Sequence, residues 1–462
     1  MCKGKDLTEV RSPQRKLMPE YLPSGCEAGL EQHKQTSLRG IAQTAAANKQ
    51  HRFRNLYGML TLKVLFNAWR SLNKKAASGV DKVTAEQYEE NLLGNLENLL
   101  DRLKRKTYKA KLVKRKYIPK DNGKFRPLGI PALEDKIVQK AAATILEAIY
   151  EQDFLETSFG YRPGKSPRMA VDELNHQIQY RGFGYVVEAD IKGFFDNMSH
   201  ELILELLSKR IDDKAFLNLI RKWLKAGILD TDNTIINPIT GTPQGGIVSP
   251  ILSNVYLHHA LDQWFEEEVK PRCSGNVALF RYADDWLCCF QYSRDASRYY
   301  EVLPKRLARF NLEVEPSKTQ ILRFSRFHPS RKRTFTFLGF EFYWMIDRKG
   351  LPRLAKRTSR KKLQGSTQRI KDWIKASRHL PKREFFLKLN AKLRGHYNYY
   401  YTRGNARSVW RFYDAALVQS FKWLNRRSHR KSLTWDQFKR LWVQMGVLKP
   451  KVNPAKRGTL VW

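Results

Sequence analysis

The sequence predicts an α+β body followed by a basic α-helical appendage. Between residues 51 and 346, short apolar runs of strand length alternate with segments whose apolar residues recur at helical spacing. From Lys356 onward almost every stretch has helical spacing. With 462 residues, of which 42% are hydrophobic, the chain is expected to form two to four packed units with real cores.

Charge separates the appendage from the body. Lys and Arg number 85 against 45 Asp and Glu, which gives a formal net charge of +40. From Arg326 to the last residue, 35 Lys and Arg stand against 6 Asp and Glu, so 29 of the 40 surplus charges lie there. An excess of this size predicts a polyanionic partner, most simply nucleic acid.

The first third of the chain is predicted to be mainly helical. Residues 1–50 are polar and predict a loosely ordered extension, with helix from about Leu38. Helical apolar spacing then appears in NLYGMLTLKVLFNAWRSLN (55–73), NLLGNLENLLDRLKRKTY (91–108) and EDKIVQKAAATILEAIYEQDF (134–154). Between the last two, YIPKDNGKFRPLGIP (117–131) predicts a β-hairpin, because Asn-Gly is a favoured hairpin turn.

The middle of the chain is predicted to form a sheet backed by helices. FGYVVEADIKGFFDNM (183–198) predicts a buried strand that ends in Asp190, and the helix SHELILELLSKRI follows it. TGTPQGGIVSPILSNVYLHHALDQWFEEEV (240–269) predicts a Gly-rich loop that leads into a long helix. VALFRYADDWLCCF (277–290) predicts a second hairpin, and FTFLGFEFYWMI (335–346) predicts a later pair of strands.

Aromatic residues are interleaved with the cations of the C-terminal region. Their rings could stack on bases or build a core. Helical spacing favours the core for Trp410, Tyr413, Leu417, Phe421 and Leu424. The cations between them are then predicted to form the binding face.

Cysteine usage and apolar runs indicate a cytoplasmic protein. The five cysteines form no Cys-x-x-Cys pair; they are Cys2, Cys26, Cys273, Cys288 and Cys289. An odd number, with two adjacent residues inside a predicted strand, predicts reduced thiols. We expect no signal or transit peptide in the polar residues 1–30, and no apolar run reaches the length of about 18 residues that a membrane span needs.

Two adjacent acids, Asp284 and Asp285, lie between apolar runs in FRYADDWLCCF (280–290). Neighbouring carboxylates repel, so one of them resists ionisation unless a cation compensates it. One interpretation is a solvated hairpin turn, since Asp is common in turns, and the other is a metal site.

A third acid favours the metal site. Asp190 follows the apolar residues of VVEADIKGFF. If the hairpin lies beside that strand in one sheet, the three carboxylates converge, and two Mg²⁺ ions would supply the compensation with hard oxygen ligands. Two such metals can activate a 3′ hydroxyl and stabilise a leaving pyrophosphate.

These acids, with TPQGG between them in sequence, resemble the palm of a reverse transcriptase. YADD (282–285) matches the Tyr-x-Asp-Asp box of that family. The successive blocks of group II intron reverse transcriptases are resembled, in order, by FRPLGIP, FGYRPGKSP, DIKGFFD, GTPQGGIVSPILSNVYLHHALD, RYADD, PSKTQIL and FTFLGFEF. LRGHYNYY resembles their maturase-specific region, and the resemblance covers about residues 50–440.

The resemblance implies a role for each acid and its neighbours. Asp190 and Asp284 would ligate the two Mg²⁺ ions, with help from the backbone carbonyl of Ile191, and Asp285 would complete the acidic cluster. Phe195 matches the bulky ring that the family places under the sugar, where it would clash with a ribose 2′ hydroxyl. The alternative is that Phe195 is a core aromatic residue next to Phe194.

Other residues are implied at the incoming deoxynucleotide. Lys120 and Arg126 on the 117–131 hairpin would hold the triphosphate, with Lys124 as the alternative to Lys120, and a solvated hairpin is the alternative for all of these cations. Gln244 and Gly245 would shape the floor of the pocket, where glycine permits a close backbone approach. Lys318 in PSKTQ matches a lysine proposed to protonate pyrophosphate, although it is nearly as well explained as a surface lysine.

The family architecture is a right hand. It implies fingers at 51–185, a palm with an antiparallel sheet at 186–344 and a helical thumb with the maturase region at 345–425. A basic C-terminal segment at 426–462 would bind DNA, and residues 1–50 form the polar extension. Because the last cysteine is Cys289, we expect none of the paired Cys and His motifs of the endonuclease domain found in many members, so that priming would use an existing 3′ end.

The leading hypothesis is an RNA-directed DNA polymerase that also binds its parent group II intron RNA and assists splicing and mobility. Its partners would be that RNA, an RNA template, a DNA primer or target and deoxynucleotides, in a bacterial cytoplasm and at the nucleoid when it acts on DNA. A freestanding relative in phage defence, CRISPR adaptation or diversity generation is the first alternative. A splicing factor that binds RNA without catalysis is the second, and the three intact acids speak against it.

Overall fold

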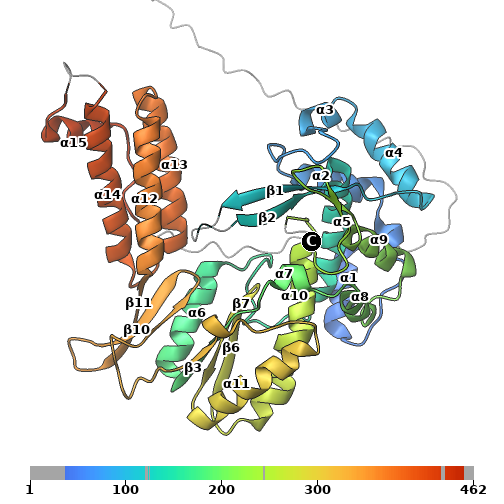
Figure 1. The fold of residues 1–462 in the computed structure, drawn as a ribbon, viewed down its shortest axis with the longest axis horizontal. Helices are drawn as coiled ribbons and strands as arrows, with labels where there is room; N and C mark the ends of the chain where they lie inside the picture. Colours follow the sequence, from blue (N-terminus) through green and yellow to red (C-terminus); the bar gives the residue numbers. More distant parts are fainter. Residues whose placement is uncertain (1–36, 120–122, 124, 243–244, 428–431, 452–462) are drawn as a thin grey trace, which may run out of the picture. The chain divides into compact units, whose positions relative to one another are not determined.

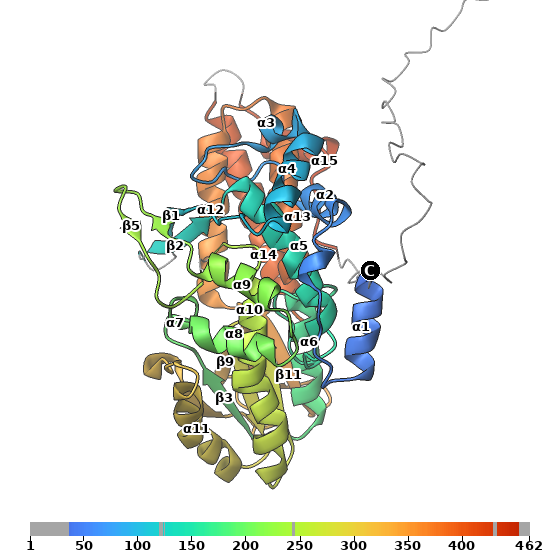
Figure 2. The same ribbon diagram turned by 90° about the vertical axis from the view of Figure 1, so that its right-hand side faces the viewer.

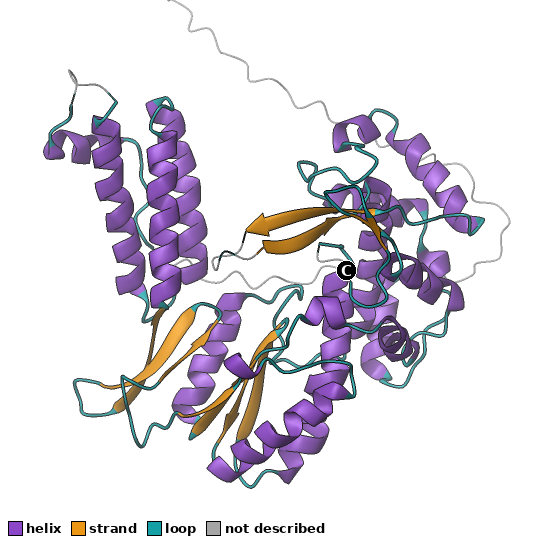
Figure 3. Ribbon diagram, viewed as in Figure 1, coloured by secondary structure: helices purple, strands orange, loops and turns teal. Residues whose placement is uncertain are grey.

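The computed structural model describes residues 37–119, 123, 125–242, 245–427 and 432–451. Across these ranges, helices and three small sheets alternate along the chain (Figures 1 and 3). The predicted mixture of α and β structure is therefore confirmed.

The helices described in the first 150 residues share one hydrophobic core, which includes one long buried helix. They are α1 (Leu38–Ala47), the 3₁₀ turn η1 (Tyr57–Met59), α2 (Leu62–Ser71), α3 (Ala85–Glu89), α4 (Leu92–Lys104) and α5 (Leu133–Tyr150). Most residues of α5 are buried, and α1 and α2 pack against it. The three alanines 141–143 are fully or almost fully buried, because short side chains let neighbouring helices approach α5 closely.

The predicted hairpin at 117–131 is confirmed as part of a four-stranded sheet. Its strands β1 (Val113–Pro119) and β2 (Phe125–Ile130) are antiparallel, with Pro119 opposite Phe125. Two short strands, β4 (Ile228–Leu229) and β5 (Ile235–Ile236), extend the sheet in the order β2-β1-β4-β5. The turn residues 120–122 and 124 lie outside the described residues.

The central sheet is antiparallel, with the strand order β6-β7-β3-β8. Its strands are β3 (Tyr185–Ala189), β6 (Val277–Tyr282), β7 (Asp285–Phe290) and β8 (Gln320–Arg323). Helix α6 (Pro167–Tyr180) packs against β6, and α11 (Ser293–Ala308) packs against β3, β7 and β8 (Figures 1 and 2). The predicted buried strand and second hairpin are therefore confirmed.

Helices on both faces explain why these strands are continuously apolar. Successive side chains of a strand point to opposite faces. Val186 and Cys289 accordingly join the core that α6 completes, whereas Val187 and Cys288 join the core that α11 completes. The adjacent cysteines thus face different cores, and both carry free thiols.

The helices of the middle region connect these strands. They are α7 (Phe194–Asn197), α8 (His200–Ser208), α9 (Lys214–Leu224), α10 (Ser249–Leu257), the π-helical turns η2 (His258–Asp262) and η3 (Phe265–Val269), and the 3₁₀ turns η4 (Lys270–Arg272) and η5 (Pro316–Lys318). The long helix predicted after the Gly-rich loop is present, but its second half is π-helical. π-Helical turns are rare in proteins, and those that occur are often found at functional sites.

A third sheet leads into the C-terminal helices. Its strands are β9 (Thr334–Phe337), β10 (Phe340–Ile346) and β11 (Pro352–Thr358), in the order β11-β10-β9. The almost wholly helical region predicted from Lys356 onward is present, but it begins at Arg360, because Lys356 still lies in β11. Its buried ammonium group contacts Asp172 Oδ1 on α6 at 2.6 Å, an interaction across 184 residues that local spacing does not reveal.

The C-terminal helices share a core of their own. They are α12 (Arg360–Ser377), α13 (Lys382–Tyr400), α14 (Ala406–Asn425) and α15 (Trp435–Gln444), and α12, α13 and α14 run side by side (Figure 1). No helix in the described part of the chain is long and apolar enough to cross a bilayer.

The five residues predicted for this core lie at different depths. Tyr413 is buried, and Leu417, Phe421 and Leu424 are partly buried against the core. Trp410 is 38% exposed, so its prediction is wrong. The buried face of α14 runs through residues 409, 412, 413, 416 and 420, so it is centred beside the predicted stripe and leaves Trp410 at its edge.

Candidate active site

The register of the central sheet brings the three predicted acids to one edge. β3 pairs with β7 so that Ala189 lies opposite Trp286. One residue further along this register, Asp190 comes beside Asp285, the first residue of β7. Asp284 lies in the two-residue turn that joins β6 to β7. The hairpin therefore does lie beside the strand that carries Asp190, which was the condition for the three carboxylates to converge.

The turn has an unusual backbone and a close neighbour. Ala283 has a φ of 57°, in the left-handed region that L-residues rarely adopt. Such a conformation persists only where the surroundings enforce it. A Cβ atom on Gly160 would lie 2.1 Å from the Ala283 nitrogen, so the absence of a side chain at Gly160 lets that backbone pack directly on the turn.

The carboxylates influence one another electrostatically. The pKa of Asp285 is raised to about 6, mainly by desolvation and then by the charges of Asp284 and Asp190. The pKa of Asp284 is also raised, first by desolvation and then by Asp190. Asp285 has exposed surface, yet protein atoms surround the turn closely enough to thin its hydration. This edge of the sheet is therefore short of positive charge.

Lys318 partly supplies that charge. Its ammonium group, at the end of the 3₁₀ turn η5, forms an ion pair with Asp190 Oδ2. This hydrogen bond raises the pKa of Lys318, so the side chain is cationic at neutral pH. A backbone ladder supports the contact, since Glu315 N donates to Asp190 O at 2.8 Å and the buried Ile191 pairs with Val314.

The two phenylalanines of DIKGFF have different environments. Phe194 is buried in the core, whereas Phe195 is half-buried on the short helix α7. The backbone of Phe195 is held from the Gly-rich loop, because Thr242 N donates to Phe195 O at 2.9 Å. A Cβ on Gly241 would come within 2.8 Å of that same oxygen. Phe194 is a core aromatic residue, and Phe195 packs against the same core with part of its surface exposed.

The Gly-rich loop also rests on the 117–131 hairpin. Gly245 has a φ of 117°, and a Cβ there would lie 2.4 Å from Gly129 O on β2. Two residues later, Ile247 N donates to Oε1 of the buried Gln139 on α5, at 2.9 Å. The close backbone approach predicted for Gly245 is thus made to protein backbone. Gln244 lies outside the described residues.

Of the predicted triphosphate cations, Arg126 is described and is exposed on β2. Its charge lowers the pKa of Asp284 and that of Tyr161, so it acts on the acidic edge. Lys120 and Lys124 lie outside the described residues.

Comparisons with known proteins agree with this geometry. The family model described as "Reverse transcriptase (RNA-dependent DNA polymerase)" matches residues 118–342, which include all three acids. Protein YkfC of Escherichia coli (strain K12) is 38% identical over 282 residues, which make up 54% of this chain and 74% of YkfC. The group II intron-encoded protein LtrA of Lactococcus lactis subsp. cremoris is 38% identical over 226 residues, 48% of this chain and 37% of LtrA.

The chain belongs to the group II intron reverse transcriptases. It spans well under half of LtrA. A more distant relative of this reverse transcriptase is the mitochondrial nuclear intron maturase 2 of Arabidopsis thaliana, which is 27% identical over 176 residues, 30% of this chain and 24% of that maturase.

The donor set of this reverse transcriptase suits a hard divalent cation. Three carboxylates, two of them with raised pKa values, provide oxygen ligands whose repulsion a cation would relieve. No group of three or more His, Cys, Asp or Glu in the described chain is gathered closely enough to hold a metal ion as it stands. Lys318 holds Asp190 instead, so metal binding would require a rearrangement of that side chain.

Sequence patterns missed two residues at the acidic edge. Tyr161 in FGYRPGKSP has a φ of 57°, and its pKa is raised by burial and by the nearby charge of Asp284. Tyr399 in the LRGHYNYY block has its pKa raised to about 12 by burial and by Tyr400, Tyr282 and Asp285. Both lie in blocks that carried the family resemblance, and that was the available signal.

Proposed function

We propose that this protein is an RNA-directed DNA polymerase that uses two Mg²⁺ ions and binds its parent group II intron RNA. The observation that carries the proposal is the β3–β7 register, which brings Asp190 beside the Asp284–Asp285 turn. The proposed right hand has fingers at 51–185, a palm at 186–344 and a thumb at 345–425, preceded by the polar extension 1–50.

The acidic edge is the proposed metal site. The metals would be bound by Asp190, Asp284 and the carbonyl oxygen of Ile191, and Asp285 would complete the acidic cluster. When bound there, Mg²⁺ would lower the pKa of the primer 3′ hydroxyl and neutralise charge on the triphosphate. The raised pKa values of Asp284 and Asp285 support this proposal, because a divalent cation would remove the cost of ionising them together.

The surrounding residues would bind and select the nucleotide. Arg126 offers a planar fork for phosphate oxygens, and Lys120, or Lys124 in its place, would add a point charge. The half-buried ring of Phe195 would occupy the space of a ribose 2′ hydroxyl and so favour deoxynucleotides. Gln244 and Gly245 would form the floor of the pocket, and Gln139 holds the same loop by accepting a hydrogen bond from Ile247 N.

Lys318 is the proposed proton donor to pyrophosphate. Its Nζ carries a proton at neutral pH because Asp190 stabilises the cation. To act on pyrophosphate, the Lys318 side chain must leave Asp190, and because 65% of it is exposed, little packing opposes that movement. Binding of a metal at Asp190 would release it.

The basic C-terminal region from Arg326 onward is proposed to bind RNA. From Arg326 onward the chain carries 29 surplus positive charges, and the described helices there share a separate core, which leaves their cations to contact phosphates. The names of LtrA and of the Arabidopsis maturase connect relatives to introns. On this basis we propose that the C-terminal helices α12, α13 and α14 bind intron RNA and that residues 426–462 bind target DNA.

Primer extension tests the polymerase directly. The purified chain, an RNA template, a DNA primer, deoxynucleotides and Mg²⁺ should give extended product, and Asp284→Ala with Asp285→Ala should abolish it. A wild-type protein that extends no primer over a range of salt and primer conditions would show that the assignment is wrong. Sequencing the RNA that copurifies with the protein expressed from its native locus tests the proposed binding of intron RNA. One abundant RNA that encodes the protein supports intron binding, whereas a mixed pool of RNAs indicates a freestanding polymerase.

A further inference from the structure

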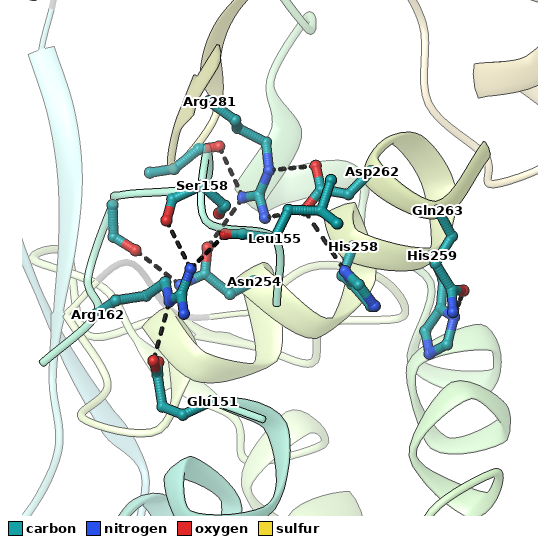
Figure 4. Close-up of polar contacts among 12 residues, drawn as sticks. Glu151, Leu155, Ser158, Arg162, Asn254, His258, His259, Asp262, Gln263 and Arg281 are labelled. Carbon is teal, nitrogen blue, oxygen red and sulfur yellow. Dashed lines mark hydrogen bonds and ion pairs between the residues drawn. The ribbon is translucent and has the colours of Figure 1, made fainter. Parts of the chain in front are cut away.

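A buried ion pair lies directly beneath the acidic turn. Arg281 Nε donates to Asp262 Oδ1 at 2.7 Å, and Arg281 Nη2 donates to Asp262 Oδ2 at 2.6 Å (Figure 4). Both side chains are 0% exposed. Burying such a pair removes two charges from water, and well-packed apolar residues often stabilise a fold as much or more. Stability alone therefore does not explain this pair.

The pair has a third contact, and that contact reaches the turn. Arg281 Nη1 donates to Ala283 O at 3.2 Å and to Asn254 Oδ1 at 3.0 Å. Ala283 is the residue with the left-handed φ, directly before Asp284. The guanidinium group therefore holds the carbonyl of the strained residue, while Asp262 fixes the plane of the guanidinium group.

Asn254 links the guanidinium group of Arg281 to the backbone on the other side of the turn. Its Nδ2 donates to Gly160 O at 2.8 Å, and the backbone of Gly160 abuts the nitrogen of Ala283. The strand end is held as well, because Arg281 N donates to Thr157 O at 3.0 Å and Phe159 N donates to Arg281 O at 2.8 Å. The turn is thus clamped between residues 157–160 and the buried guanidinium group.

Asp262, which orients the guanidinium group of Arg281, lies in a π-helical segment. Asp262 is the last residue of the π-helical turn η2, in which Gln263 N donates to His258 O. The extra residue of a π turn redirects the side chains that follow it. His258 faces Asp262 from within the same turn, with Nδ1 3.6 Å from Oδ2. The carboxylate that orients Arg281 therefore belongs to a segment that is π-helical and not α-helical.

We infer that Arg281 is a positioning residue that sets the place of the Asp284–Asp285 turn through the Ala283 carbonyl, with Asp262 and Asn254 as its supports. The inference rests on the proposed polymerase function and adds to it a device for holding the acids. Arg281 contacts the turn through the Ala283 carbonyl. Its positive charge also lowers the pKa of Asp284, and Arg281→Lys keeps that charge. A lysine at this position keeps the charge opposite Asp262 but lacks the fork that also reaches Ala283 O.

The test compares Arg281→Lys with Arg210→Lys. Arg210 is a matched control because it is also buried, with Nε 3.0 Å from Asp153 Oδ2 and Nη1 donating to the carbonyls of Asn48 and His51. None of these contacts involves the turn. Thermal unfolding gives the folded fraction of each variant, and both are expected to lose stability.

Two readouts separate positioning from mere stability. Per folded molecule, Arg281→Lys should lower kcat for primer extension by about 10- to 100-fold, since a 1 Å displacement of reacting groups can cost about 100-fold, while KM for deoxynucleotide stays within about threefold. The half-saturating Mn²⁺ concentration without nucleic acid, from the electron paramagnetic resonance signal of free Mn²⁺, should rise about tenfold. Arg210→Lys should match the wild type in both.

A second variant keeps the inference falsifiable if Arg281→Lys does not fold. Asn254→Ala leaves the Arg281–Asp262 pair intact but removes the bond to Gly160 O and the bond from Arg281 Nη1. It should therefore show the same two effects to a smaller degree. Wild-type kcat and Mn²⁺ affinity in the variant that folds would overturn the inference. If the wild type itself extends no primer, the proposed function fails, and the Mn²⁺ titration still decides the positioning role by itself.

Discussion

Gly160→Ala is the smallest change that should displace the acidic turn. The added Cβ would lie 2.1 Å from Ala283 N, 2.8 Å from Ala283 Cα and 2.8 Å from the carbonyl carbon of Tyr282. All three atoms belong to backbone, so no rotamer change relieves the clash. Ordinary carbon–nitrogen contact begins near 3.4 Å, so the turn or residue 160 must move by about 1 Å.

This displacement has a stability cost and an activity cost. Extra volume in a well-packed site typically costs about 1–3 kcal/mol. A movement of about 1 Å in groups that position reacting atoms can cost about 100-fold in rate. We therefore expect Gly160→Ala to remain folded at 25 °C and to lose about two orders of magnitude in primer-extension kcat.

Gly395→Ala is the matched control. Gly395 lies within α13, and a Cβ there would have no atom within 4 Å. Alanine should stabilise that helix by up to about 1 kcal/mol and leave kcat unchanged. Steady-state primer extension, normalised to the folded fraction from thermal unfolding, measures both variants. Full activity of Gly160→Ala would refute the claim that this contact places the turn.

Three further predictions concern the acidic edge and the nucleotide. Asp285→Asn should raise the melting temperature at pH 8 without Mg²⁺, because the pKa of Asp285 is raised from 3.8 to about 6 in the fold and its ionised form therefore destabilises the native state. The gain in melting temperature should fade below pH 6 and vanish below about pH 4. A gain that persists below pH 4 would contradict this cause. Phe195→Ala should increase ribonucleotide incorporation relative to deoxynucleotide by at least about tenfold in single-nucleotide extension, as expected for a lost steric barrier of about 1.4 kcal/mol, whereas unchanged discrimination would exclude Phe195 as the barrier. Arg126→Ala should raise KM for deoxynucleotide by about 10- to 100-fold, the range expected from loss of a charge-assisted hydrogen bond; Arg126→Lys should recover part of the affinity, and an unchanged KM in the alanine variant would remove Arg126 from the triphosphate site.

Local patterns predicted the elements that local physics controls. The two paired strands of the 117–131 hairpin, the apolar run that became β3 and the amphipathic segment that became α4 all formed as expected, because side-chain periodicity and strand preference act over a few residues. The same logic placed the start of the C-terminal helical region four residues too early, at Lys356 and not Arg360, and was wrong about the burial of Trp410. There, packing against α6 and the orientation of α14 decided the outcome.

The three acids illustrate the boundary between the two kinds of information. Their residue types and the ordered blocks around them were enough to indicate a polymerase site before any contact was known. That Asp190 comes beside Asp285 depends on the pairing of strands 95 residues apart in the sequence, since 285 minus 190 is 95. No local pattern encodes that pairing.

The sequence by itself determined the family, the acidic residues and the basic character of the region from Arg326 onward. These properties depend on residue identity and order alone. Only the tertiary structure decided that Gly160 abuts Ala283, that Lys318 holds Asp190, and that Arg281 reaches the turn from a buried pair with Asp262. The physical reason is that each of these contacts joins distant parts of the chain, and their distances and directions are set by how helices and strands pack together.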